Sequence, residues 1–196
     1  KALPADADTL SIAGDDTVSL GGTGSYSIPP LSNTNTYQWS LPTGATITSG
    51  SGSRSIDASF SSSTETGYDS ISVYGQNGCG KGSKAYFKVY VQPEPSPIDS
   101  IAGDTSVCAG TQGLVYKAFP EPSEADSVEW IVPDGFTIVS GRESRSIEVN
   151  IDSTSFSNGN IIARGINESG EGEADSLYVN VYRIPDVSIS HTQDLD

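Results

Sequence analysis

Apolar and polar residues alternate in two similar stretches of the chain. One spans Tyr37–Leu41 and the other Val128–Val132, and every second residue of each is apolar. A period of two is typical of a β-strand with one face buried. Each stretch holds one of the two tryptophans, Trp39 and Trp130, and each is followed by Pro, one further residue and Gly. We therefore expect each Trp to lie in a β-sandwich core, worth about 4–6 kcal/mol by buried area, rather than in a sugar-stacking platform.

The alternation belongs to a longer pattern that occurs twice. Ser100–Asp104 copies Ser11–Asp15, and Ser144–Ile147 copies Ser53–Ile56. Between the copies lies Pro93–Pro97, whose three prolines favour an extended, fairly stiff linker. This repetition predicts one β-sandwich domain in residues 1–97, a second in 98–183, and a tail in 184–196 that leads to a further module. No long 3.6-residue period occurs, so the fold class is all-β.

Within the first repeat the pattern predicts individual strands. Strand A is expected at Thr9–Ala13, and Arg54–Phe60 alternates inward apolar with outward polar residues. Ser70–Gln76 and Lys84–Gln92 form a hairpin, because Asn77–Gly80 between them contains the Asn-Gly pair that favours a tight turn.

The net charge of −15 is unevenly divided between the repeats. Residues 1–98 hold eight acidic against five basic residues, and residues 99–196 hold seventeen against five. So acidic a surface repels phosphate groups, which disfavours nucleic acid and anionic membranes as partners. No apolar run approaches the ~18 residues of a membrane helix, and no signal peptide is present, so we expect no membrane insertion. We interpret the chain as a fragment of a longer extracellular protein.

Catalytic motifs are missing from the sequence. The single histidine, His191, lies in the terminal tail, so the scaffold has no Ser-His-Asp or Cys-His arrangement. Neither a metal-type His/Cys cluster nor a Gly-rich loop between strand and helix occurs. We expect that the chain is not an enzyme.

The order of the motifs resembles the PKD-like immunoglobulin-type repeats found in tandem in secreted and surface proteins of Bacteroidetes. The matching pieces are Ile-Ala-Gly-Asp, Val107–Gly110, the Trp followed by Pro-x-Gly, Ser-Gly, and Asn77–Gly80. They cover nearly the whole chain. Unlike the better-known PKD pattern, the Trp is not followed by an Asp-Phe-Gly-Asp-Gly type sequence, so nothing can be built on those acidic residues.

The resemblance implies two immunoglobulin-like sandwiches in an extended arrangement, with neighbouring repeats of the same chain as partners. Such repeats serve as stalks, spacers or adhesive arrays of cell-surface proteins, gliding adhesins among them, or as accessory modules of secreted glycan-degrading enzymes. Type IX secretion is implied only if a C-terminal sorting domain follows. The alternative to a spacer is therefore carbohydrate binding, with surface glycans as the partner, for which Tyr74, Tyr90 and Tyr182 are candidate stacking residues.

The two cysteines are not expected to bond to each other. Repeats of this type often carry Cys both before strand B and at the last hairpin, and here only Cys108 and Cys79 remain, with Ser19 and Ser169 at the other two positions. In an immunoglobulin-type sandwich these two positions lie at opposite ends of the domain. If the two domains run end to end, Cys79 and Cys108 occupy the two most distant ends of the pair, too far apart for a disulfide. We expect Cys79 and Cys108 to pair with absent neighbouring modules, or else to be incidental thiols.

Acidic residues in the loops that are expected to face the junction of the two repeats are a candidate Ca²⁺ site. Calcium takes six to eight oxygen ligands, and clustered carboxylates repel one another without a cation. No dense Asp-x-Asp-x-Asp motif occurs, so solvated loops are the alternative. The nine candidates are Asp15, Asp16, Glu65, Glu121, Glu124, Asp126, Glu168, Glu171 and Glu173.

An Asp-Ser/Thr-aliphatic pattern occurs six times. It is similar to the acceptor motif of Bacteroidetes O-glycosylation, although polar-polar-aliphatic is also how a strand begins after a turn. The candidate acceptors are Thr9, Thr17, Ser70, Ser100, Ser127 and Ser176.

Overall fold

The structure is a computed structural model that describes residues 2–8, 10–183 and 185. Its described residues form seventeen strands and no helix, which confirms the all-β prediction, and accordingly no helix there is suited to crossing a membrane. By internal contacts the chain divides into two units. The first runs to Pro95 and takes in Ile166–Glu171, and the second begins at Ser96 and resumes at Gly172.

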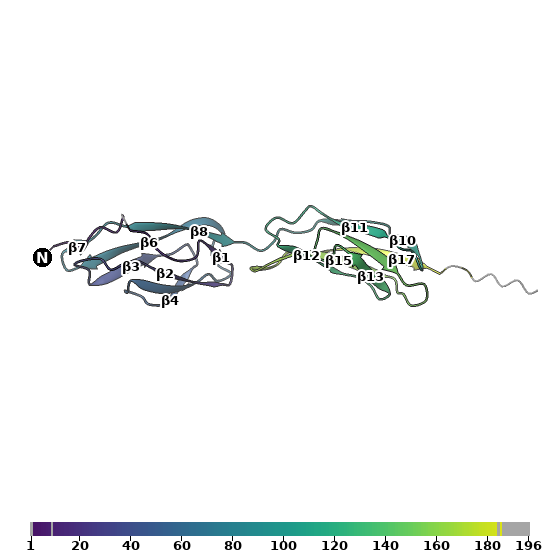
Figure 1. Ribbon diagram of the computed structural model, residues 1–196, viewed down its shortest axis with the longest axis horizontal. Helices are drawn as coiled ribbons and strands as arrows, with labels where there is room; N and C mark the ends of the chain where they lie inside the picture. Colours follow the sequence, from purple (N-terminus) through teal and green to yellow (C-terminus); the bar gives the residue numbers. More distant parts are fainter. Residues whose placement is uncertain (1, 9, 184, 186–196) are drawn as a thin grey trace, which may run out of the picture. The chain divides into compact units, whose positions relative to one another are not determined.

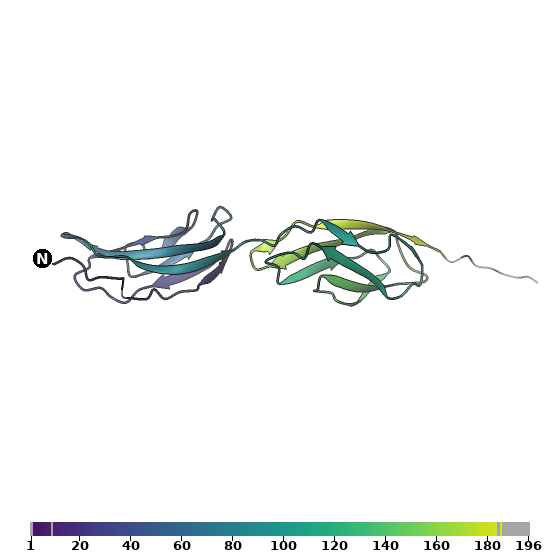
Figure 2. The same ribbon diagram turned by 90° about the horizontal axis from the view of Figure 1, so that it is seen from above.

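The first repeat is a sandwich of two sheets (Figures 1 and 2). One sheet has the strand order β1-β8-β6-β3, with the short β7 paired to β6, and the other has the order β2-β5-β4. The strands are β1 (Thr17–Ser19), β2 (Thr23–Ser27), β3 (Thr36–Ser40), β4 (Thr46–Ser49), β5 (Ser55–Ser59), β6 (Gly67–Asn77), β7 (Gly80–Lys81) and β8 (Ala85–Gln92).

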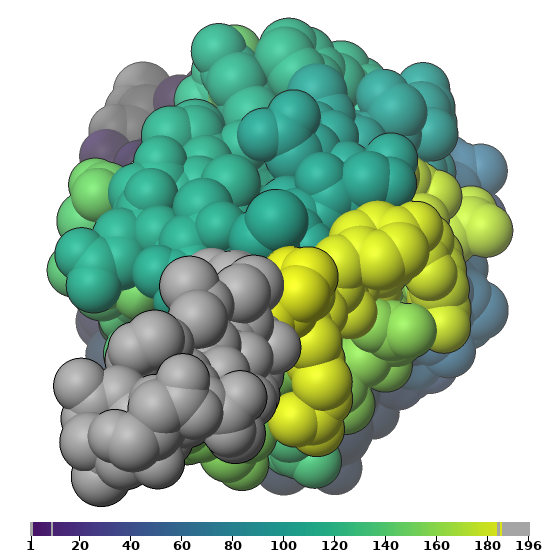
Figure 3. Space-filling model, turned by 90° about the vertical axis from the view of Figure 1, so that its right-hand side faces the viewer, coloured from purple at the N-terminus to yellow at the C-terminus, as the bar shows by residue number. Residues whose placement is uncertain are grey.

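The second repeat has the same arrangement of sheets. Its larger sheet has the order β10-β17-β15-β12, with β16 on β15, and its smaller sheet has the order β13-β14-β11-β9. Figure 3 shows the end of this repeat, where the last residues of β17, in yellow, lie against the teal surface that includes its partner β10. The strands are β9 (Ser100–Ala102), β10 (Ser106–Cys108), β11 (Leu114–Phe119), β12 (Ser127–Ile131), β13 (Phe136–Ser140), β14 (Ser146–Ile151), β15 (Gly159–Asn167), β16 (Gly170–Glu171) and β17 (Asp175–Tyr182).

The two tryptophans lie on the inner faces of β3 and β12, but they are not equally buried. Trp130 is 6% exposed and belongs to the core of the second repeat. Trp39 packs against the first core but is only partly buried, so the expectation of two fully buried rings is wrong for the first repeat. In each repeat the indole Nε1–H donates to a carbonyl fourteen residues later, that of Ser53 or Ser144. This bond gives the repeated Ser-Arg-Ser-Ile motif a structural reason.

The first strand of the first repeat is not where the alternation predicted it. In the expected Thr9–Ala13 segment Thr9 lies outside the described residues, and Ala13 makes only an isolated bridge with Ser27. The sequence missed β1, which follows the Gly14-containing turn and pairs parallel with β8. Three residues are too few to display an alternation, so β1 had no recognisable pattern.

A buried tyrosine in each repeat explains the Ile-Ala-Gly-Asp motif. The Tyr26 hydroxyl donates to the backbone oxygen of Asp15 (3.3 Å), and the Tyr116 hydroxyl donates to that of Asp104 (3.0 Å). Both rings are at most 1% exposed. The preceding glycine lies so close to the ring that a Cβ built on it would be 2.3 Å from Tyr26 Cδ1 or 2.2 Å from Tyr116 Cδ1. The motif thus needs Gly for the ring and the next residue's carbonyl for the hydroxyl.

Two tyrosines should titrate well after the others. Burial, with the nearby charge of Asp15 or Asp104, raises the pKa of Tyr26 and of Tyr116 to about 12. The neutral phenols therefore contribute stability that is complete below the unfolded pKa of 10 and is lost as the pH rises through about 12. Phenolate absorbance during alkaline titration of the folded protein should show two tyrosines that ionise near pH 12, and one in Tyr26→Phe. Absence of such a late step would contradict the burial.

Candidate functional site

The outward surface of β6 and β8 in the first repeat carries four tyrosines. Side chains alternate across a strand, so the inward positions of β6 and β8 are the buried Ile71, Val73, Val89 and Val91, and the tyrosines face solvent. Tyr68 is 71% and Tyr86 is 66% exposed, while Tyr74 and Tyr90 are partly covered. We name this surface the tyrosine face; it comprises Tyr68, Tyr74, Tyr86 and Tyr90 with Lys81, Lys84 and Lys88.

Strand register sets the spacing of the rings on the tyrosine face. Tyr68 lies directly opposite Tyr90, and their ring centroids are 4.8 Å apart at an interplanar angle of 52°. Tyr86 lies opposite Ser72, and Lys88 lies opposite Ser70. Ser70 and Ser72 separate Tyr68 from Tyr74 on the outward side of β6, so the two tyrosine rings rise above the small serines between them.

The three lysines of the face lie over its rings. Lys88 Nζ is 3.8 Å from the centroid of Tyr68. Lys81 Nζ and Lys84 Nζ are 5.3 and 6.0 Å from the centroid of Tyr74. Cation–π contacts at exposed sites are worth only about 0.5–1 kcal/mol each. The ammonium groups can therefore leave the rings at small cost.

The charge of the tyrosine face is opposite to that of the chain. Three of the five basic residues in positions 1–98 lie on it, and no outward position of β1, β3, β6 or β8 is acidic. The second repeat has no such face. Register places Asn158, Arg164, Ser176 and Asn180 at the positions of the four tyrosines, and Glu171, Ala174 and Tyr178 at those of the three lysines.

Of the three tyrosines proposed from sequence, the structure brings two together. Tyr74 and Tyr90 share the tyrosine face, whereas Tyr182 lies at the end of β17 in the other repeat. The sequence did not identify Tyr68 and Tyr86 as stacking candidates. The alternation of Tyr86, Lys88 and Tyr90 was a usable signal, but Tyr68 was hidden because β6 begins at Gly67, three residues before the predicted start.

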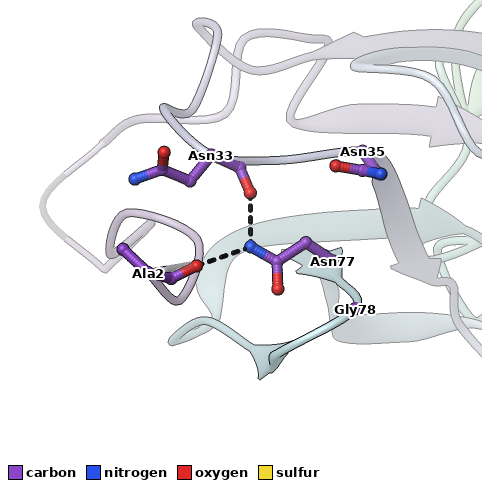
Figure 4. A pocket seen from close by; sticks show the side chains of 5 residues that line it. All are labelled: Ala2, Asn33, Asn35, Asn77 and Gly78. Carbon is purple, nitrogen blue, oxygen red and sulfur yellow. Dashed lines mark hydrogen bonds between the residues drawn. The ribbon is translucent and has the colours of Figure 1, made fainter.

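A second surface feature is a depression of about 200 Å³ lined by asparagines at the opposite end of β6. The Asn77 amide Nδ2 donates to the backbone oxygens of Ala2 (2.9 Å) and Asn33 (2.6 Å), as Figure 4 shows. Its Oδ1 accepts from the backbone N–H groups of Cys79 and Gly80. Asn77 therefore has no spare hydrogen-bonding group for a ligand, and its role is to hold the turn. Asn167 Oδ1 accepts the corresponding turn bonds in the second repeat.

The acidic candidates for calcium gain no support from the structure. Among the residues it describes, no group of three or more His, Cys, Asp or Glu side chains is arranged to hold a metal ion. Glu121 is ion-paired with Arg145 at 2.6 Å, and the Asp16 side chain accepts a bond from Thr17. Calcium binding stays a prediction that calorimetry can test.

The structure also gives the positions of the cysteines and of most glycosylation candidates. Cys79 lies in the turn between β6 and β7 and Cys108 ends β10, and both are exposed. Among the glycosylation candidates, Thr9 lies outside the described residues. The single histidine, His191, also lies outside them. Ser70 and Ser176 lie within strands, whereas the other three are the first residues of theirs: Thr17, Ser100 and Ser127. The strand-start interpretation thus fits those three.

Solved structures similar to this chain are tandem immunoglobulin-like or related domains. Immunoglobulin domains 1–4 of sidekick-1 match with 12% identity and a TM-score of 0.39, covering 93% of this chain and 48% of that one. Titin domains Z1Z2 in complex with telethonin match with 16% identity and a TM-score of 0.32, covering 92% and 98%. Chicken CNTN1 FN1–FN3 domains match with 10% identity and a TM-score of 0.37, covering 93% and 68%.

Comparison with curated proteins finds no match. A family model for the PKD-like domain matches the chain twice, over residues 5–89 and 94–179. The two matched ranges correspond to the two sandwiches and together take in most of the sequence. The chain belongs to the PKD-like domain family, with two copies of the domain in tandem.

Proposed function

We propose that the chain is a structural spacer within a large extracellular protein, either a surface adhesin or a secreted multidomain protein. Family membership and the tandem arrangement support a module that is repeated to build length. The two cores are filled by apolar side chains. This is consistent with a structural role.

The observation that carries this proposal is which residues repeat. The bonds from Trp39 and Trp130 to their serine carbonyls recur, as do the contacts of Tyr26 and Tyr116 with Gly-Asp. All of these anchors serve folding. The outward faces of the large sheets differ between the repeats, so what the two domains have in common is their internal construction.

The spacer proposal requires a stiff connection, and the native cysteines allow a direct test. Each repeat has one exposed cysteine, Cys79 or Cys108, so spin labels on both report the distance between repeats by double electron–electron resonance. We expect a narrow distribution, since the prolines of Pro93–Pro97 favour extended backbone. The matched control replaces Pro93, Pro95 and Pro97 with Gly and should broaden it. A wild-type distribution as broad as that of the control would refute a stiff spacer.

The biological setting is proposed on the resemblance of the repeat motifs. We place the parent protein at the surface of a Bacteroidetes cell, exported by the type IX route and related to gliding adhesins. Its immediate partners would be neighbouring repeats of the same chain. Detection of the parent protein in the surface fraction of such a cell, and its loss when type IX secretion is blocked, is the corresponding test.

Carbohydrate binding is the second candidate function, and the tyrosine face favours it. Exposed aromatic rings on a sheet offer apolar faces to sugar C–H groups, and tyrosine hydroxyls can bond with sugar hydroxyls. The two most exposed rings, Tyr68 and Tyr86, lie on one strand pair and face the same way. In this case the first repeat would combine a spacer fold with an accessory glycan-binding surface.

A further inference from the structure

We propose that the tyrosine face of the first repeat binds an acidic polysaccharide, a chain of sugars that carry one carboxylate per ring. The inference rests on the second candidate function, carbohydrate binding, and adds the chemical class of the sugar. Its basis is the combination of ring platforms with lysines on outward strand positions of which none is acidic, with Asp16 at the edge of the face, bonded to Thr17 opposite Tyr90.

The rings provide platforms at separate places along the sheet. The Tyr68–Tyr90 pair lies at one end of the face, Tyr86 lies opposite Ser72 in the middle, and Tyr74 lies farther toward the β6–β7 turn. Ser70 is exposed and adds a small hydroxyl group between the platforms, whereas Ser72 is only 6% exposed. An extended polymer can therefore lie along the face and stack several of its rings in turn, whereas a small ligand would contact only one platform.

The lysines decide between acidic and neutral sugars. In the free protein Lys88 covers Tyr68, and Lys81 and Lys84 lie near Tyr74, so a sugar that stacks on these rings must first displace an ammonium group. A neutral sugar gives that ammonium nothing in exchange. A sugar carboxylate accepts a charge-assisted hydrogen bond from the displaced lysine while the sugar ring takes its place on the tyrosine. Displacing the ammonium costs either sugar little, but an acidic sugar gains a charge-assisted bond that a neutral sugar lacks.

The spacing of the lysines fits a carboxylated chain better than a heavily sulfated one. Lys84 and Lys88 are four residues apart on the same strand side, or about 13 Å at the rise of a β-strand. Single cations this far apart, with an aromatic ring between them, suit a chain of low charge density that has an uncharged ring face for stacking. A sulfated ring with several charged edges calls for a denser group of cations and leaves less apolar surface to stack.

The charge of the full chain makes the preference notable. A net charge of −15 repels an acidic polymer over most of the surface, and the tyrosine face is where that repulsion is locally reversed. The second repeat, in which Glu171, Ala174 and Tyr178 replace the lysines, keeps exposed tyrosines at Tyr178 and Tyr182 but lacks the lysines of the site. It serves as a comparison within the same molecule.

The test measures binding of the full chain to polygalacturonate by titration calorimetry, with the same polymer in methyl-esterified form as the neutral probe. We expect binding to the acid form and much weaker binding to the ester. The double substitution Lys84→Gln and Lys88→Gln should weaken binding about tenfold, as loss of charged hydrogen bonds does. Tyr68→Ala should also weaken it, whereas Tyr178→Ala, an exposed tyrosine of the second repeat, should not.

Each of the other outcomes of this test would reject a defined part of the proposal. Equal binding of both polymers, unaffected by the lysine substitutions, would overturn the acidic preference and leave carbohydrate binding standing. Binding of neither would overturn both, and the spacer proposal would remain. Sedimentation that reveals self-association lost in the Lys84/Lys88 double variant would assign the face to the acidic repeat of a second copy and overturn the proposal. Unchanged circular dichroism of every variant is the folding control.

Discussion

Replacing Trp130 with alanine should lower the free energy of unfolding of the second repeat by about 3–5 kcal/mol, the usual cost of removing a buried Trp side chain. The indole is 6% exposed within the second core, and its Nε1–H donates to the carbonyl of Ser144 at 2.8 Å. The substitution therefore opens a cavity and leaves that carbonyl without its donor. A loss of this size is a large part of the stability of a domain of this length.

Urea unfolding of the full chain followed by circular dichroism measures this loss, while fluorescence from Trp39 reports on the first repeat separately. The matched variant is Trp39→Ala, whose effect should be smaller because that indole is only partly buried. Trp130→Phe separates the two contributions, since it keeps most of the ring but removes the donor. Equal losses from the two alanine variants would show that the difference in burial is wrong.

Gly103→Ala should destabilise the second repeat by about 1–3 kcal/mol, the range for overpacking a well-filled site. The new Cβ would lie 2.2 Å from Cδ1 and 2.6 Å from Cε1 of Tyr116. That ring is fully buried and its hydroxyl is held by the carbonyl of Asp104, so it has little freedom to withdraw. Gly14→Ala should act in the same way on the first repeat through Tyr26.

Thermal unfolding with a double-mutant cycle tests the cause. If the clash is the reason, Tyr116→Leu should absorb most of the cost of Gly103→Ala, so that the double variant is more stable than the sum of the single effects. Gly78→Ala is the neutral control, because a Cβ there meets nothing within 4 Å. Fully additive effects would point to backbone conformation in place of the ring contact.

The sequence was informative wherever a pattern was long enough to repeat. The period of two around Trp39 and Trp130, copied 91 positions later, predicted the strands that hold these residues and the tandem repeat. The motifs Gly-Asp and Ser-Arg-Ser-Ile were visible as repeats, but their reasons were not. Those reasons are contacts between segments distant in sequence, Tyr26 with Asp15 and Trp39 with Ser53, which spacing alone does not identify.

The candidate site was only half visible in the sequence. Tyr74 and Tyr90 were recognised as outward residues of paired strands, but their neighbours depend on where β6 begins and on its register with β8. Tyr68 follows a Ser/Thr-rich loop whose end carries no signal. Tyr182 was grouped with the others because exposed tyrosines look alike in sequence, although it belongs to a different sheet. The lysines could not be assigned to the site from the sequence, because their contacts with the rings depend on the strand register.

The parallel pairing of β1 with β8 bears on how such a unit carries mechanical load. Thr17–Ser19 lies alongside Tyr90–Gln92 in the same direction, and β10 lies alongside β17 in the second repeat. When the two ends of a domain are pulled apart, one strand of such a pair is drawn backward and the other forward. Their hydrogen bonds are then strained together, in shear, and must break at once. A domain closed in this way resists tension better than one in which the bonds of the end strands break one at a time.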